Sequence, residues 1–256
     1  MFSACCTIDE PNAGKIATDH NELAAKGEDL RIAEERKLPD AIQNQADVIG
    51  YLPEVDWNLD NKVYQILKTH GPQWRKVVLK DKDILKLSEN PIQFLSLEGQ
   101  GMFLGQVDSK KKKIMEGVCH YKDSEGNYFL SCYERNLPHK YGLFASKTGE
   151  YFLGEYMDGN RVYGKSYYPD QKKTYDGSYE DNLPHGVGVL KFDDGREYRG
   201  QFFGGKPDGK GVYNWPNGNK YEGEFKDGKQ HGMGYLYVAK NQKTFLTYWE
   251  DGVMHD

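Results

Sequence analysis

A 23-residue repeat in the second half of the chain limits what this sequence can fold into more than any other feature. The segments 175–179, 198–202 and 221–225 all read Tyr-x-Gly-x-aromatic, and they begin 23 residues apart. Three glycine pairs keep the same spacing, namely Gly186/Gly188, Gly209/Gly211 and Gly232/Gly234. Such a period indicates a repeat architecture in which each unit completes its core by stacking on its neighbours.

The repeat has the pattern of a β-hairpin. Positions one, three and five of a strand share a face, so two aromatic rings flank a glycine in every unit. We expect a ring from the adjoining hairpin to lie across the bare glycine backbone and fix the register. Asp194-Gly195 and Asn217-Gly218 supply the positive φ that tight turns require. The residues given this structural role are Tyr175, Gly177, Tyr179, Tyr198, Gly200, Phe202, Tyr221, Gly223 and Phe225.

The repeat frame predicts where the units begin and end. The sequence divides into a disordered N-terminus (1–15), a helical docking region (16–95) and a repeat domain (96–256). The repeat domain holds three clear units (175–197, 198–220, 221–243), two degenerate ones (128–151, 152–174) and two doubtful terminal ones (101–127, 244–256). The predicted fold is mostly β, an elongated twisted antiparallel sheet of successive hairpins preceded by a small α-helical region.

The first half of the chain has a different composition. Residues 126–256 contain 21 of the 29 glycines and 16 of the 19 tyrosines, whereas all nine isoleucines lie earlier. The apolar residues Ile16, Leu23 and Leu30 recur at intervals of seven, which predicts a docking helix with a narrow apolar stripe. A second helix is expected from about residue 59 and should stop near Gly71-Pro72, with a third beginning around Trp74.

The segment 221–235 resembles a MORN repeat (membrane occupation and recognition nexus), and the resemblance extends over roughly residues 101–256. It implies an elongated sheet of hairpins with a non-catalytic role in assembly or targeting. Proteins of this type occur in ciliary radial spokes, parasite basal complexes and membrane junctions. They also occur as appendages of lipid kinases and of a lysine methyltransferase.

Charge and hydropathy exclude several function classes. The net charge is −5 with a pI near 5.9, so there is no basic field to hold a nucleic-acid backbone. No apolar run approaches the ~20 residues that span a bilayer, and the first ten residues lack the basic region of a signal peptide. We therefore expect a cytoplasmic protein whose cysteines are reduced.

No pattern of catalytic or metal-binding residues stands out. His139, His185 and His231 are spaced by 46 residues, which would place them roughly 19 Å apart in a sheet and too far apart to share a metal. Cys119, His120 and Cys132 lack the paired C-x2-C spacing of structural zinc. The sequence predicts no enzyme activity, no cofactor and no small-molecule substrate.

Some aromatic side chains of the sheet must face outward and are candidates for binding a helix or an extended peptide. The predicted partner-binding residues are Tyr213, Trp215, Tyr235 and Tyr237. Two features instead suggest a membrane. Cys5 and Cys6 offer a site for paired acylation, and the basic run Lys110, Lys111, Lys112 and Lys113 offers attraction to anionic lipid. Residues 126–256 hold 17 basic and 18 acidic side chains, so the sheet itself is not cationic.

These observations predict a structural adaptor that binds protein partners within a cytoskeletal or ciliary assembly, axonemal or radial-spoke-like, as the resemblance suggests. The first alternative is an acylated peripheral tether between the cytoplasmic face of a membrane and the cytoskeleton. The second is a non-catalytic regulatory subunit of a kinase or methyltransferase.

Overall fold

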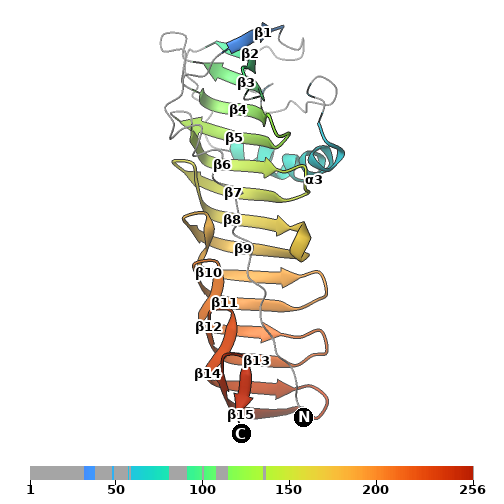
Figure 1. Ribbon diagram of the computed structural model, residues 1–256, viewed down its shortest axis with the longest axis vertical. Coiled ribbons are helices and arrows are strands. Elements are labelled where there is room, and N and C mark those ends of the chain that lie inside the picture. The colour runs from blue at the N-terminus through green and yellow to red at the C-terminus, as the bar shows by residue number, and fades with distance from the viewer. Residues whose placement is uncertain are drawn as a thin grey trace. The chain divides into compact units, whose positions relative to one another are not determined.

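The computed structural model describes residues 32–37, 48, 57, 59–80, 91–99, 101–107, 115–134 and 137–255, most of which lie in β-strands (Figure 1). The strands pair antiparallel in the order of the sequence. The chain divides into two compact units, one of residues 17–162 and another whose described part is residues 163–255. The predicted fold class, a mostly β chain of successive antiparallel hairpins, is confirmed.

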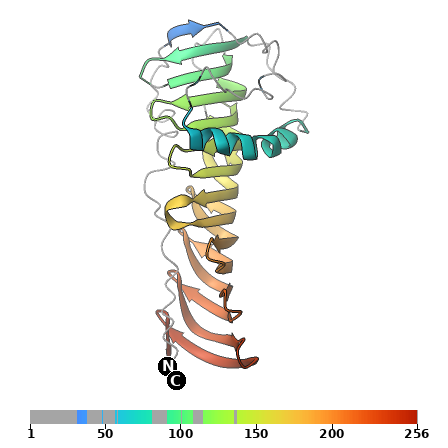
Figure 2. The same ribbon diagram turned by 90° about the vertical axis from the view of Figure 1, so that its right-hand side faces the viewer.

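The described residues of the first unit form seven strands and a helix that packs on one face of the sheet (Figure 2). The strands are β1 (Ile32–Arg36), β2 (Ile92–Leu97), β3 (Gly101–Val107), β4 (Met115–Asp123), β5 (Tyr128–Glu134), β6 (Leu137–Ala145) and β7 (Tyr151–Met157). β1 lies in the segment 16–95 that was predicted to be helical, and β2 begins in it, so for these strands the expectation is wrong. β1 gains its hydrogen bonds by pairing with β2 across some 60 residues of sequence, which local periodicity does not reveal.

The helix α3 (Asn61–Val78) begins at Asp60, whose carboxylate accepts a hydrogen bond from the Lys62 backbone N–H at 2.8 Å. It continues through Pro72, so the expected stop near Gly71-Pro72 is wrong. A proline inside a helix costs about 3 kcal/mol, but the stripe of apolar residues continues on both sides of it and is buried. The buried residues of α3 are Val63, Leu67, Gly71, Trp74 and Val78.

The apolar stripe of α3 packs on the side chains that β6 and β7 present on one face of the sheet. Leu143, Ala145 and Leu153 are almost completely buried in the cluster that contains Leu67 and Trp74. The indole Nε1 of Trp74 donates a hydrogen bond to the backbone carbonyl of Tyr141 at 3.0 Å. This contact joins the helix to the backbone of β6 and sets its position along the strand.

The second unit contains the clear repeats, and each repeat is one hairpin. Its strands are β8 (Asn160–Tyr168), which spans the boundary between the units, β9 (Lys173–Glu180), β10 (Leu183–Phe192), β11 (Glu197–Phe203), β12 (Lys206–Asn214), β13 (Lys220–Lys226), β14 (Lys229–Val238), β15 (Lys243–Glu250) and β16 (Val253–His255). Between consecutive repeats, the turns use Gly195 at φ 92° and Gly218 at φ 86°, as predicted. Within the repeats, the hairpins use two-residue turns in which both residues have positive φ, such as Asp227 (49°) and Gly228 (83°).

Candidate functional site

One face of the second unit is built on a row of glycines. The register pairs Gly177 with Gly188, Gly188 with Gly200, and so on through Gly211 and Gly223 to Gly234. The row therefore crosses six consecutive strands without a side chain. Each repeat fills this gap with the ring of its own first tyrosine.

Tyr198 shows how the ring occupies the gap. A Cβ placed on Gly200 would lie 2.6 Å from both the Gly211 Cα and the Tyr198 hydroxyl, and one on Gly211 would meet the Tyr198 ring. The hydroxyl donates a hydrogen bond to the Gln201 carbonyl at 2.8 Å. The covering ring thus comes from the same hairpin, and the prediction that it comes from the adjoining hairpin is wrong. A side chain leans along its own strand, so position one already lies over position three.

The rings also join one repeat to the next. Tyr175 packs edge-on against Phe202 of the following repeat at 4.9 Å between centroids, and Tyr198 packs likewise on Phe225 at 4.8 Å. At the end of the series, Tyr221 meets Trp249 at 5.5 Å, so Trp249 takes the place of the next repeat's aromatic residue. Burial raises the pKa of the Tyr221 hydroxyl to about 12. This face is the core of the repeat unit and does not offer a binding surface.

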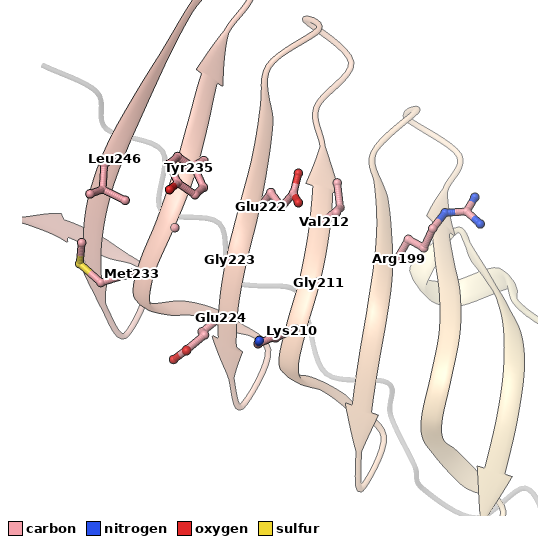
Figure 3. A pocket seen from close by; sticks show the side chains of 11 residues that line it. Arg199, Lys210, Gly211, Val212, Glu222, Gly223, Glu224, Met233, Tyr235 and Leu246 are labelled. Atoms are coloured by element: carbon pink, nitrogen blue, oxygen red, sulfur yellow. The ribbon is translucent and has the colours of Figure 1, made fainter.

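The opposite face of the sheet, which we call the outward face, carries a groove of about 540 Å³ that crosses β11 to β15. Figure 3 shows Tyr235, Glu222 and Val212 side by side on neighbouring strands, with Met233, Glu224 and Lys210 along the other side. The glycine row forms the floor between these two rows of side chains. The lining residues are Arg199, Lys210, Gly211, Val212, Glu222, Gly223, Glu224, Met233, Gly234, Tyr235 and Leu246.

The groove is charged at one end and apolar at the other. Arg199 forms an ion pair with Glu197 at 3.2 Å, and Glu222 forms one with Lys220 at 3.1 Å. At the β14–β15 end, Met233, Tyr235 and Leu246 are 51%, 58% and 60% exposed. Three neighbouring apolar side chains at such exposure form the kind of patch that marks interaction surfaces.

The structure separates the four predicted partner-binding aromatics. Tyr235 lies in the groove, and Tyr237, half-buried, is two residues further along β14. Tyr213 is only 1% exposed, so the expectation that it offers an outward surface is wrong. The half-buried Trp215 packs on the Tyr213 ring at 4.8 Å. The repeat frame explains the error, since the counterpart of Tyr235 one period earlier is Val212, and Tyr213 is the next residue along.

Other groove residues escaped sequence reasoning. Met233, Leu246, Arg199 and Glu222 were not singled out, because none is an aromatic residue with an obvious binding role. Subtracting 23 from Tyr235 gives Val212, and the strands on either side then supply Arg199 and Glu222. The signal was present in the repeat frame once the outward position had been identified correctly.

His139, His185, Cys119 and Cys132 occupy structural positions. His185 Nδ1 lies 3.0 Å from Glu180, and His139 lies between Glu134 and Asp158. Over the part of the chain that the structure describes, no three His, Cys, Asp or Glu side chains are grouped to hold a metal. Cys119 and Cys132 are buried thiols. The predicted lipidation residues Cys5 and Cys6 and the basic run at 110–113 lie outside the described residues.

His120 is a buried structural group. Its Nε2 donates a hydrogen bond to the Val48 carbonyl at 2.6 Å, which leaves Nδ1 to accept one from the Tyr128 hydroxyl at 2.6 Å. Burial lowers the pKa of this imidazole from 6.5 to about 4. The side chain therefore stays neutral at physiological pH and joins Val48 to the sheet.

Comparisons with known proteins identify the repeat. The family model described as MORN repeat matches residues 175–195, 198–220 and 221–238. A search of curated proteins found no match. Among solved structures, the TCP domain of Drosophila melanogaster SAS-4, in complex with a proline-rich motif of Ana2, aligns with 14% identity and a TM-score of 0.33. That alignment covers 51% of this chain and 83% of the other. None of the helices described here has the length and apolarity to cross a bilayer.

Proposed function

Because residues 175–238 are three consecutive MORN repeats, we propose that this chain is a non-catalytic scaffold that binds protein partners through the outward face of its repeat sheet. MORN repeats support a structural or protein-binding role, and proteins built from them are generally non-catalytic. The observation that carries the proposal is the groove over β11–β15, where exposed Met233, Tyr235 and Leu246 lie beside charged side chains. Apolar anchors within a polar rim are typical of protein interfaces.

The finer proposal places this scaffold in the cytoplasm, within a cytoskeletal or ciliary assembly such as an axoneme or a radial spoke. Its support is the resemblance to MORN proteins of such assemblies. The near balance of 17 basic and 18 acidic side chains over residues 126–256 also favours a protein surface over nucleic acid or an anionic bilayer as the partner.

The alternative of an acylated membrane tether has two features in its favour, the adjacent pair Cys5 and Cys6 and the basic run at residues 110–113. Under the scaffold proposal, replacing both by serine leaves the localisation of the full chain unchanged. If a membrane-bound fraction disappears in the double variant, the tether replaces the scaffold as the better explanation.

Proximity labelling of the full chain in its own cell, followed by co-purification of the neighbours found, tests the scaffold proposal. We expect Tyr235→Ala combined with Leu246→Ala to reduce recovery of direct partners. The matched control is Val187→Ala, because Val187 is 66% exposed and lies on the same face of the second unit, in β10. The proposal fails if partner recovery is the same for both variants, or if the purified chain itself shows kinase or methyltransferase activity.

A further inference from the structure

We propose that the outward side chains of β14 and β15 form a docking site for an amphipathic α-helix of a partner protein, with basic residues along the edge of the helix that lies over β13. We call the residues Met233, Tyr235, Tyr237 and Leu246 the β14–β15 platform. This inference rests on the proposed function and specifies the kind of partner that the groove accepts.

The repeat frame relates the platform to a surface that already holds a helix. Tyr141, Leu143 and Ala145 of β6 precede Met233, Tyr235 and Tyr237 of β14 by 92 residues, four repeat lengths. Leu153 of β7 precedes Leu246 of β15 by 93 residues. The cross-strand pairing is also the same, because Leu143 faces Leu153 in the first unit and Tyr235 faces Leu246 in the second.

The β6–β7 surface is covered by α3. Leu143, Ala145 and Leu153 are 1%, 0% and 5% exposed, and they share one apolar cluster with α3. In contrast, Tyr235 and Leu246 at the corresponding positions are 58% and 60% exposed. The same backbone frame, with apolar side chains of similar or larger size, thus presents a helix-binding surface that no described segment covers.

Neither of the other two clear repeats has an equivalent apolar set. In β12 and β13 the corresponding residues are Lys210, Val212, Asn214 and Glu222, and in β10 and β11 they are Val187, Val189, Lys191 and Arg199. A helix placed over either pair of strands would remove charged side chains from water, which costs free energy; these are Lys191 and Arg199 in β10–β11 and Lys210 and Glu222 in β12–β13. The apolar residues therefore select β14–β15 as the docking position.

The charges beside the platform determine the chemistry of the helix. Glu222 and Glu224 project from β13 on the two sides of the glycine floor of the groove (Figure 3). The helix that occupies the corresponding surface, α3, carries Lys62, Lys68, Arg75 and Lys76. A partner helix with lysine or arginine beside its apolar stripe would place opposite charges next to each other, which favours encounter and orientation. The outward span from Met233 to Tyr237 is roughly 13 Å, so about nine helical residues cover it.

A peptide-display selection against the full chain tests the inference. The library holds 18-residue peptides, the length of α3. Half of them carry apolar residues at the spacing of Val63, Leu67, Trp74 and Val78 with varied charges elsewhere, and half are scrambled versions of the same compositions. We expect striped peptides with basic edges to be enriched over scrambled ones. Selected peptides should lose about thirtyfold or more in affinity for the Leu246→Asp chain, a change of hot-spot size.

Val187→Asp is the matched control, since it places the same charge at an exposed position of the same face and should leave peptide binding unchanged. Circular dichroism and thermal unfolding establish that each variant is folded, and Tyr235→Ser serves as the second variant if Leu246→Asp does not fold. The inference is overturned if scrambled peptides are enriched equally, or if neither Leu246→Asp nor Tyr235→Ser changes the affinity of the selected peptides.

Sedimentation of the unlabelled chain decides whether a second copy is the occupant. A dimer that dissociates in Leu246→Asp would overturn the partner-helix inference in favour of self-association. If partner co-purification depends on Tyr235 and Leu246 but peptides with the apolar spacing of α3 are not enriched, the scaffold proposal is supported and the helix-docking inference is overturned. If such peptides bind the platform but no partner protein depends on this face, the helix-docking inference is supported and the scaffold proposal is overturned.

Discussion

The two glycines of each repeat's second strand have different physical roles. Gly209 has φ 93° and lies at the irregularity in the pairing of β11 with β12, a conformation that a side chain resists. Gly211 lies in regular strand and is required for space, because the Tyr198 ring fills the position of a Cβ. Gly209 is therefore required by the backbone conformation, and Gly211 is required by the packing of the Tyr198 ring.

A double-mutant cycle separates packing from conformation. We expect Gly211→Ala to cost about 2 kcal/mol or more of unfolding free energy through overpacking, and the cost to shrink when Tyr198→Ala removes the ring. Gly204→Ala is the control, since a Cβ there meets nothing within 4 Å although φ is 53°. In urea unfolding, the free-energy cost of Gly204→Ala should be the same whether or not Tyr198 is replaced by alanine. Additive costs for Gly211→Ala and Tyr198→Ala would contradict the ring-in-gap explanation.

Gln230 occupies a position where other repeats use proline. Pro184, Pro207 and Gln230 are spaced by 23 residues, all are buried, and each backbone carbonyl accepts a hydrogen bond from a turn glycine at 2.9 Å. The Gln230 amide, at 2% exposure, has no hydrogen-bond partner. We predict that Gln230→Pro raises the melting temperature, with a gain of about 1 kcal/mol or more from removing a desolvated amide and restricting the unfolded chain. A lower melting temperature would show that the amide is satisfied in solution.

His120 predicts a pH dependence of stability. Its folded pKa of about 4 lies below the ordinary 6.5, so the unfolded chain binds the proton more tightly. Stability from this group is fully present above pH 6.5 and falls as the pH drops toward 4, by roughly 3 kcal/mol in total. Denaturant unfolding at several pH values should show that His120→Leu lacks this component. The matched variant His185→Gln, at a half-buried histidine whose Nδ1 lies 3.0 Å from Glu180, should keep it.

At the scale of elements, α3 is held by packing and by hydrogen bonds to the sheet, which include those of Trp74 and of Lys62. Trp74 is completely buried, and its indole N–H meets the carbonyl of Tyr141. We expect Trp74→Ala to destabilise the chain by about 3–5 kcal/mol, and Trp74→Phe by a smaller amount that reflects the lost hydrogen bond and partial cavity. Val77→Ala is the control on the same helix, because Val77 is 41% exposed. Equal unfolding free energies for the Trp74 and Val77 variants would show that α3 does not cover the core.

At the scale of the whole molecule, the repeats couple mainly to their neighbours. The Tyr198 ring contacts Phe202 in its own repeat and Phe225 in the next, whereas Trp249 closes the series against Tyr221. Hydrogen exchange should therefore show faster exchange on both sides of β11 in Tyr198→Ala, and faster exchange confined to β13–β15 in Trp249→Ala. Identical exchange patterns for the two variants would contradict nearest-neighbour coupling.

The repeat period, its hairpins and the turn glycines Gly195 and Gly218 followed from sequence alone, because spacing and φ requirements are local properties of the chain. The strands β1 and β2 did not, since their pairing depends on contacts between residues distant in sequence. The continuation of α3 through Pro72 was also missed, because burial on the sheet outweighs the local cost of the proline.

The candidate surface was likewise predictable only in part. Tyr235 was identified as an outward aromatic from alternation, whereas Tyr213 was placed on the wrong face because alternation was applied without the repeat frame. Sequence by itself determined the unit, its period and the residues that fill it, since these follow from strand geometry. Only the tertiary structure decided which hairpin supplies each covering ring, which face is core, and that α3 covers one apolar strand pair while the β14–β15 platform lies open. Those outcomes depend on how strands and helix pack in space, which no local pattern encodes.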